Sequence, residues 1–297
     1  MTRRGSLLFG AMCIIWGLPY LLIKVAVRDL QPATLVCFRT GIGAVILVPI
    51  AVARGELGPV LARWKPLLAY TVVELAIPWV LLSTAEQRLP SSLSGLLVAA
   101  VPLVGAVFST TLKDRDPLGT RGVVGLLVGL AGVAALVGFD VSGADAGSVA
   151  IVAFVVLGYA AGPLILAHAL SDLPSMGVVA ASLALCALAY APFALTRLPA
   201  STPPHRVLAA VVVLGVVCTA LAFVLFFHLI GEIGPVRATV ITYVNPAVAV
   251  VLGVVFLHEG FGVATGVGFA LILFGSLLAT GVGSRQRSLA VTPVAEP

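Results

Sequence analysis

Residues 235–257 read PVRATVITYVNPAVAVVLGVVFL and contain a single charged side chain, Arg237. About 20 predominantly apolar residues are enough for a helix to cross the hydrocarbon core of a bilayer. Tyr243, Asn245 and Pro246 nevertheless lie near the middle of the run, where polar side chains and a break in helical hydrogen bonding are costly. On a helical wheel these three residues share one face, and mostly valine residues cover the other. The stretch predicts a membrane-spanning helix that turns its polar face to protein or to a water-filled cavity.

The composition of the whole chain predicts the same class of protein. Of the 297 residues, 60% are hydrophobic and 10% are charged, and the mean hydropathy is +1.17. Soluble domains carry about 25% charged residues, so this chain has too few to cover a water-facing surface. We therefore predict an all-α polytopic membrane protein with ten transmembrane helices. The predicted spans are residues 6–26, 32–53, 66–85, 91–112, 119–138, 147–167, 175–196, 207–228, 235–257 and 261–282.

The distribution of basic residues predicts the orientation of the chain in the cytoplasmic membrane. If the N-terminus is cytoplasmic, eleven basic residues lie on the cytoplasmic side and five on the other, with Arg39 inside the membrane. The five are Lys24, Arg28, Arg88, Arg197 and Arg206. By the positive-inside rule, both termini are then cytoplasmic. The net charge of +5 thus reflects topology, and we expect no nucleic-acid partner.

Weak internal similarity predicts that the chain consists of two related halves. Shifts of 143 or 144 residues align four pairs: Pro49 with Pro192, Arg54 with Arg197, Pro102 with Pro246, and Gly122 with Gly266. We predict a five-helix repeat over residues 1–141, a second over 142–284, and a disordered cytoplasmic tail over 285–297. An odd number of spans per repeat inserts the two copies in opposite orientations. Inverted repeats of this kind are an architecture of secondary transporters.

Two stretches resemble a known family. WGLPYLLIK (residues 16–24), followed by Pro32, Arg39 and Ala44, resembles the opening pattern of the EamA-type transporters of the drug/metabolite transporter superfamily. YVNPAVAVVLGVVFLHEGFGVATGVGFALILFG (residues 243–275) is similar to the second-repeat signature of that family, including a glutamate after the span. The resemblance implies ten helices, cytoplasmic termini and movement of small metabolites, often export of amino acids. The first repeat departs from the pattern, because Arg115 occupies the position of the corresponding glutamate.

Intramembrane charges are costly and by default suggest function, which makes Glu74 the main candidate. Pro78 lies four residues later and removes the helical hydrogen-bond partner of the Glu74 carbonyl. Glu74 is a candidate proton carrier or acceptor of a substrate amine, and the alternative is a structural partner for Arg39. For Arg39, structural and substrate-binding roles both stay open.

Aromatic and amide side chains complete the candidate cavity. Trp16 and Tyr20 are four residues apart and share a helix face, so they either line a cavity or pack. Tyr243 and Asn245 either touch substrate or hydrogen-bond between helices. The predicted substrate-binding residues are Trp16, Tyr20, Arg39, Glu74, Tyr243 and Asn245, and the predicted helix kinks are at Pro78, Pro102 and Pro246.

Catalytic motifs do not emerge from the sequence. HEG at residues 258–260 begins like a zinc-binding His-Glu-x-x-His, but Gly262 occupies the place of the second histidine, and no Walker A motif is present. We expect no metal, no cofactor and no enzymatic activity. The prediction is a secondary active transporter of a small polar metabolite, working by alternating access and coupled to protons or to exchange. Its partners are a small-molecule substrate and the lipid bilayer, and it acts as a monomer or homodimer. The alternatives are an intramembrane enzyme acting on a lipid-linked substrate, and a channel.

Overall fold

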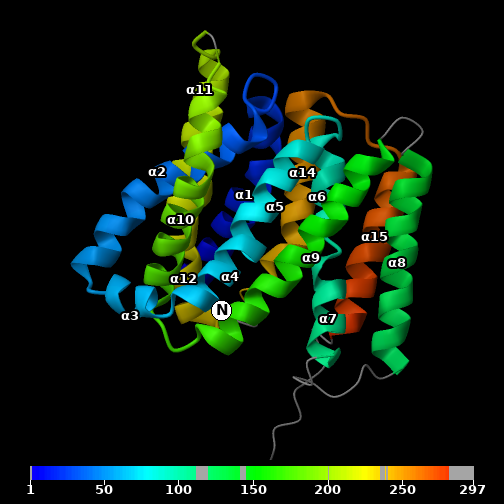
Figure 1. Cartoon of the computed structure of the whole chain (residues 1–297). Coiled ribbons are helices and arrows are strands. Elements are labelled where there is room, and N and C mark those ends of the chain that lie inside the picture. Colours follow the sequence, from blue (N-terminus) through cyan, green and yellow to red (C-terminus); the bar gives the residue numbers. More distant parts are fainter. Residues whose placement is uncertain are drawn as a thin grey trace, which may run out of the picture.

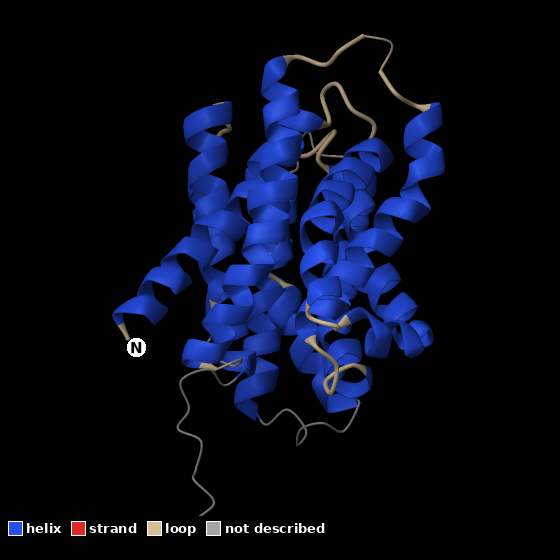
Figure 2. Cartoon of the chain, turned by 90° about the vertical axis from the view of Figure 1, so that its left-hand side faces the viewer, coloured by secondary structure: helices blue, strands red, loops and turns tan. Residues whose placement is uncertain are grey.

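The computed structural model describes residues 2–111, 120–140, 145–199, 201–234, 238 and 240–280. All regular secondary structure in these ranges is helical, and the longer helices run side by side as a bundle (Figure 1, Figure 2). The predicted all-α class is therefore confirmed. The predicted tail, residues 285–297, lies outside the described residues.

The helices of the first half follow one another with short connections. They are α1 (Arg3–Ala26), α2 (Pro32–Ala53), α3 (Leu57–Ala62), α4 (Trp64–Tyr70), η1 (Thr71–Ala76), α5 (Ile77–Ala85), α6 (Ser91–Val98), α7 (Val101–Thr111) and α8 (Thr120–Asp140). Local signals set several of the starts. The Thr2 hydroxyl accepts the backbone N–H of Gly5 as the N-cap of α1, and Pro32 occupies the first turn of α2, where its missing N–H costs nothing.

The second half has a similar sequence of helices. They are α9 (Ala146–Ala169), α10 (Ser175–Thr196), α11 (His205–Gly215), η2 (Val216–Leu221), α12 (Ala222–Ile233), α14 (Ile241–Leu257) and α15 (Val263–Thr280). The Asp145 carboxylate accepts the backbone N–H of Gly147 and caps α9.

The helices coincide with the predicted spans, although not all reach membrane length. Seven helical stretches are long and apolar enough to cross a membrane. They begin at Arg3, Pro32, Trp64, Ser91, Ala146, Ser175 and His205. The shorter apolar helices Thr120–Ala135, Ile241–Leu257 and Val263–Leu278 fall on the three remaining predicted spans. The structure thus shows a multi-pass pattern, with fewer full-length spans in the described ranges than the ten predicted.

Three of the predicted spans are not regular α-helices. The span predicted at 66–85 consists of α4, η1 and α5, and the span predicted at 207–228 lies within α11, η2 and α12. Both η1 and η2 are π-helical, an irregularity that is frequent at functional sites. The span predicted at 91–112 is interrupted by a turn at Ala99 and Ala100, between α6 and α7.

Helices from the two halves pack on each other throughout the bundle. α2 packs along α10, α6 along α14, and α8 along α15, the last pair at one side of Figure 1. α1 also contacts α12 and α14, while α9 contacts α5 and α7. Small residues permit the closest approach: a Cβ on Gly132 of α8 would lie 2.7 Å from the Gly268 carbonyl oxygen of α15. Large apolar side chains such as Val45 and Leu188 remain exposed, as expected for a surface that faces lipid.

Candidate functional site

Arg39 of α2 is buried where α2 meets helices of the second half. Only 7% of the residue is exposed. Its Nε donates a hydrogen bond to the hydroxyl oxygen of Thr219 in η2 over 3.0 Å, and its guanidinium carbon lies 3.7 Å from the ring centroid of Trp79 in α5. The ion pairs of the described residues include none between Arg39 and an acidic side chain. A buried guanidinium is therefore held by a hydroxyl and an aromatic face rather than by a carboxylate.

Glu74 lies in η1 and packs against α9. A Cβ placed on Gly162 would lie 2.7 Å from the Glu74 Cβ and 2.8 Å from its Cδ, and it would overlap the Oε2 atom. Gly158, one helical turn earlier, leaves similar room for the Val73 carbonyl and the Pro78 ring. The Glu74 Oε2 is buried and has no hydrogen-bond partner. Two glycines of α9 thus accommodate the π-helical segment and bring the carboxylate against the α9 backbone.

At each π-helical segment a side-chain hydroxyl donates a hydrogen bond to a backbone carbonyl. In η2, the Thr219 hydroxyl donates to the Leu214 carbonyl, five residues back, over 2.8 Å. In η1, the Tyr190 hydroxyl of α10 donates to the carbonyl of Ala76 over 3.0 Å, and Pro78 follows at the start of α5. In both cases the hydroxyl gives the carbonyl of Leu214 or Ala76 a hydrogen bond from a side chain, whereas a regular helix bonds its carbonyls to backbone N–H groups.

The same two segments occupy matching positions in the two halves. Each residue of η1 corresponds to the residue 145 positions later in η2, from Thr71 and Val216 to Ala76 and Leu221. By this register Glu74 corresponds to Thr219. Thr219 of η2 accepts the hydrogen bond from Arg39, and Glu74 of η1 has the buried carboxylate oxygen without a hydrogen-bond partner.

Trp16 and Tyr20 of α1 have different surroundings. The Trp16 ring lies 4.7 Å from that of Phe226 and 6.0 Å from that of Phe223, both on α12. Tyr20 is 7% exposed and packs near Gly95 of α6. These contacts place Trp16 in an aromatic cluster with α12 and Tyr20 at the contact of α1 with α6.

Asn245 makes a helix-to-helix connection. With its amide nitrogen oriented as the donor, it bonds to the Ile241 carbonyl over 3.0 Å and to the Cys13 carbonyl of α1 over 3.1 Å. Of the two roles predicted for Asn245, these contacts favour the structural one. Tyr243 is half-buried on the same helix, and its backbone N–H donates to the Val240 carbonyl.

The three prolines predicted to kink helices lie in different local structures. Pro78 follows the π-helical segment η1, and Pro102 follows the turn that separates α6 from α7. α14 is continuous across Pro246, from Ile241 to Leu257, so a kink at Pro246 stays a prediction.

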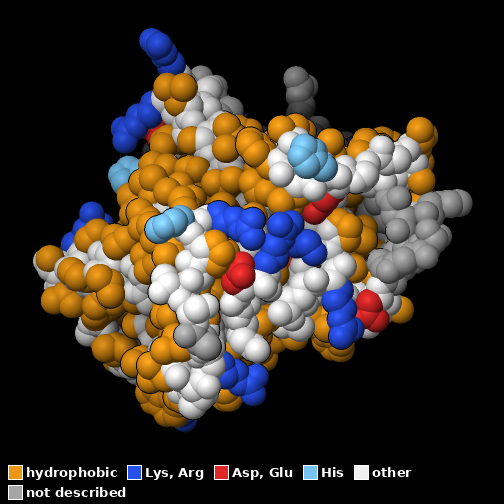
Figure 3. Space-filling model, turned by 90° about the horizontal axis from the view of Figure 1, so that it is seen from above, with side chains coloured by type: hydrophobic (Ala, Val, Ile, Leu, Met, Phe, Trp, Pro, Cys, Tyr) orange, Lys and Arg blue, Asp and Glu red, His pale blue; other side chains and the backbone are white. Residues whose placement is uncertain are grey.

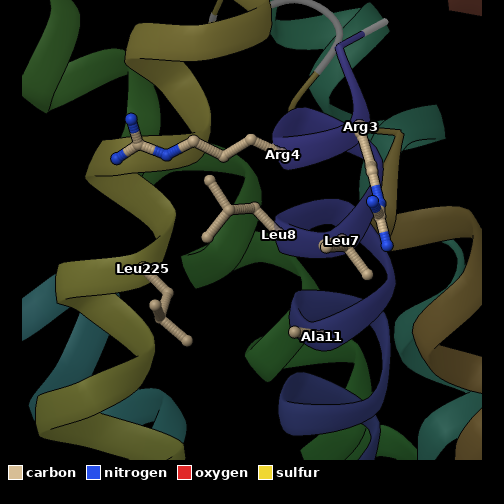
Figure 4. A pocket seen from close by; sticks show the side chains of 6 residues that line it. All are labelled: Arg3, Arg4, Leu7, Leu8, Ala11 and Leu225. Atoms are coloured by element: carbon tan, nitrogen blue, oxygen red, sulfur yellow. The ribbon is translucent and has the colours of Figure 1, made fainter.

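A groove at the surface lies away from all of these residues. It has a volume of about 550 Å³ and lies at the start of α1, beside α12. Figure 4 shows its lining residues, Arg3, Arg4, Leu7, Leu8, Ala11 and Leu225. None of the predicted substrate-binding residues lines it.

Three polar residues near the candidate site were missed by the sequence analysis. Thr219 accepts the hydrogen bond from Arg39, and Tyr159 of α9 packs against the core cluster that contains Trp79. Glu86 directly follows α5, and it is fully buried. The repeat comes close to a signal for Thr219: the sequence shifts of 143 and 144 residues place Glu74 opposite Val217 and Cys218, and the structural register of 145 places it opposite Thr219. Nothing in the sequence distinguishes Glu86 from a solvated loop residue.

Comparisons with known proteins bear on the whole chain. The profile of the EamA-like transporter family matches residues 3–138 and 147–281. A protein of Bacillus subtilis (strain 168) named "Uncharacterized transporter YvbV" is 24% identical over 297 residues, with 97% of this chain and 95% of that protein covered. "Uncharacterized inner membrane transporter YedA" of Escherichia coli (strain K12) is 29% identical over 287 residues, with 92% and 90% covered. A solved crystal structure has a TM-score of 0.67 and 22% identity over 96% of this chain and 100% of that one, which shows the same fold.

Proposed function

This chain belongs to the EamA-like transporter family, and we propose that it is a secondary transporter that moves a small polar molecule by alternating access. Its relatives are named as transporters, one of them as an inner membrane transporter, and its apolar helices form a multi-pass membrane protein. Membrane transport of a small molecule is thus the function that the family indicates.

The observation on which the proposal rests is the buried Arg39. A guanidinium presents five N–H donors in a planar fork that suits a carboxylate. Here the Nε bonds to Thr219, one face covers Trp79, and no acidic side chain of the described ranges forms an ion pair with Arg39. A permanently charged group at this depth is costly without an anionic partner, and a substrate carboxylate supplies that partner.

Glu74 provides the complementary charge. One of its carboxylate oxygens is buried and has no hydrogen-bond partner, so ionisation is unfavourable unless a cation binds. A proton or a substrate ammonium neutralises the group. Both roles make the state of Glu74 depend on what occupies the cavity, as a coupling residue requires.

The two charges together favour a zwitterionic substrate. A carboxylate directed to Arg39 and an ammonium directed to Glu74 describe a free amino acid. We infer that this class, moved by exchange or against protons, is what the transporter carries. Trp16, Tyr20, Tyr243 and Asn245 stay candidates for the wall of the cavity.

Alternating access requires two halves that move relative to each other, and the packing is consistent with this. α2 pairs with α10, α6 with α14, and α8 with α15, so at these three positions a helix of one half packs on the corresponding helix of the other. The matching register of η1 and η2 points to the same relationship. We propose ten membrane helices arranged as two inverted repeats, residues 1–141 and 142–284, with both termini cytoplasmic.

A ligand panel tests the proposed substrate class. Zwitterionic amino acids are compared with the corresponding amines, which lack the carboxylate, and with the corresponding carboxylic acids, which lack the ammonium. We expect only the zwitterions to raise the unfolding temperature of the purified wild-type protein. In Arg39→Gln this stabilisation should disappear, whereas Arg63→Gln, an exposed arginine paired with Asp172, should keep it. Equal stabilisation of the Arg39→Gln and wild-type proteins would overturn the role of Arg39.

A further inference from the structure

One end of the bundle, at the top of Figure 1, contains a second group of charged residues. α1, α5 and α14 end there, and α6 begins there. Viewed from above in Figure 3, Lys and Arg side chains gather near the middle of this face, with acidic side chains beside them. We call the residues Lys24, Glu86 and Glu259 the end cluster.

Lys24 links α1 to the end of α5 by hydrogen bonds. Its Nζ donates to the backbone carbonyl of Glu86 over 2.7 Å and to that of Leu89 over 2.8 Å. Both carbonyls lie at or just beyond the C-terminal end of α5, where a cation is favoured by the helix dipole. The Lys24 ammonium therefore uses two of its three donors on the backbone.

Glu259 links the end of α14 to the start of α6 by hydrogen bonds. Its carboxylate accepts the backbone N–H of Ser91 over 2.7 Å and that of Ser92 over 2.9 Å. A carboxylate at this position satisfies two N–H groups that the helix itself leaves free. Because α14 belongs to the second half and α6 to the first, this contact joins the two halves at this end.

Glu86 lies within this arrangement with no hydrogen bond to its side chain. The residue is 0% exposed, and both carboxylate oxygens are buried without a hydrogen-bond partner. The Glu86 carboxyl interacts electrostatically with three charged groups, those of Lys24, Arg39 and Glu259. The titratable hydroxyl groups of Tyr20 and Tyr159 also face it. No ion pair within 4 Å joins Glu86 to a cation in the described ranges.

The protonation state of Glu86 follows from this environment. Glu86 directly follows the apolar stretch Trp64–Ala85. Burial raises the pKa of its carboxyl well above the usual range, and the nearby Lys24 lowers it only in part. While this end of the bundle is closed and Glu86 is buried, the neutral carboxylic acid form of Glu86 is therefore favoured. Exposure to water on opening would return the carboxyl to its ordinary acidity.

We propose that Glu86 is a proton-binding site that controls the opening of this end of the transporter. One proton binds the carboxylate as the end closes, and the carboxylic acid releases that proton to water as α6 and α14 separate. This inference rests on the proposed transport cycle. It adds to Glu74 a second proton-binding residue, which lies outside the candidate cavity and next to the contact that joins the two halves.

Accessibility to a thiol reagent tests the proposal. Ser92→Cys places a reporter at a buried position whose backbone N–H donates to Glu259, and Gln87→Cys places a matched control at an exposed position next to Glu86. Both are made in a variant whose four native cysteines are replaced. The labelling rate of the reporter divided by that of the control removes the pH dependence of the thiol itself. If each opening releases one proton, a higher pH favours the open state, and the labelling ratio should rise up to tenfold for each unit by which the pH increases.

Variants of the end cluster distinguish proton binding by Glu86 from the hydrogen bonds that Glu259 makes between α14 and α6. Glu86→Gln is permanently neutral, so its ratio should be low and independent of pH, while Glu86→Asp should keep the pH dependence. Glu259→Gln weakens the contact between halves, so its ratio should rise at every pH and still depend on pH. A pH-independent ratio with Glu86 present, or an unchanged pH dependence in Glu86→Gln, would overturn the proposal. Substrate exchange measured on the same protein shows separately whether the transport function holds.

Discussion

Replacing Gly162 by alanine should destabilise the protein, because this glycine leaves room for the Glu74 side chain. The added Cβ would lie 2.7 Å from the Glu74 Cβ and 2.8 Å from its Cδ, well inside normal contact distances, and it would overlap Oε2. Overpacking of this kind costs about 1–3 kcal/mol. Against that, alanine favours a helix over glycine by about 1 kcal/mol.

Gly10 of α1 provides the matched control. It is exposed on its helix, and a Cβ there would meet no atom within 4 Å. Gly10→Ala and Gly162→Ala gain the same helix propensity, so the difference between them isolates the steric term. We expect Gly162→Ala to unfold with a free energy about 1–3 kcal/mol below that of Gly10→Ala.

The assay is unfolding of the purified protein in detergent, followed by tryptophan fluorescence, for both variants and the wild type. The double variant Gly162→Ala with Glu74→Ala should recover part of the loss, because it removes the Cδ and Oε2 atoms but keeps the Glu74 Cβ. Equal stability of the two single variants would refute the packing of Glu74 against α9. So would a double variant no more stable than Gly162→Ala.

Three further substitutions test separate contacts. Thr219→Val should lower the affinity for substrate at least tenfold, measured by thermal stabilisation, because Arg39 loses the acceptor that orients it; unchanged affinity would contradict this. Asn245→Leu should lower the unfolding free energy by about 0.6 kcal/mol, a typical interhelical hydrogen bond in a membrane protein, and a rise would argue against the bond to α1. Hydrogen bonding from Arg88 lowers the pKa of Asp145, so its stabilising effect is present above the ordinary pKa of an aspartate and is lost as the pH falls through the lowered value. Asp145→Asn should therefore weaken the pH dependence of the unfolding temperature below about pH 4, and an unaltered acid limb would contradict the contact.

The fold class could be predicted because apolar length is written directly in the sequence. A chain with 10% charged residues and repeated apolar runs has few options other than a helical bundle in a membrane. The boundaries of α2 and α10 agree with the prediction at both ends, since Pro32 begins one and polar loops bound both. The π-helical η1 and η2 were not predicted, because an apolar run gives no signal for a change of helix type, and the Tyr190 hydroxyl bond to Ala76 at η1 joins residues far apart in the sequence.

The candidate site was predicted only in part. Arg39 and Glu74 stand out in sequence because a charge within an apolar run is rare. In the structure Arg39 is buried, and Glu74 has a buried carboxylate oxygen. Their partners could not be found this way: the Arg39 bond joins residues 180 positions apart, and Gly162 shows its role only once α9 lies on η1. Glu86 escaped notice because it belongs to a polar connection whose burial results from packing.

Counterflow in proteoliposomes distinguishes a carrier from a channel and shows whether transport depends on Arg39. Vesicles loaded with an amino acid that stabilises the purified protein are diluted into the same labelled amino acid, and its accumulation inside is followed over time. We expect transient accumulation above the external concentration in the wild type, strong reduction in Arg39→Gln, and no reduction in Arg63→Gln. Labelled substrate that only equilibrates, with no transient excess and no effect of Arg39→Gln, would contradict a carrier built around Arg39.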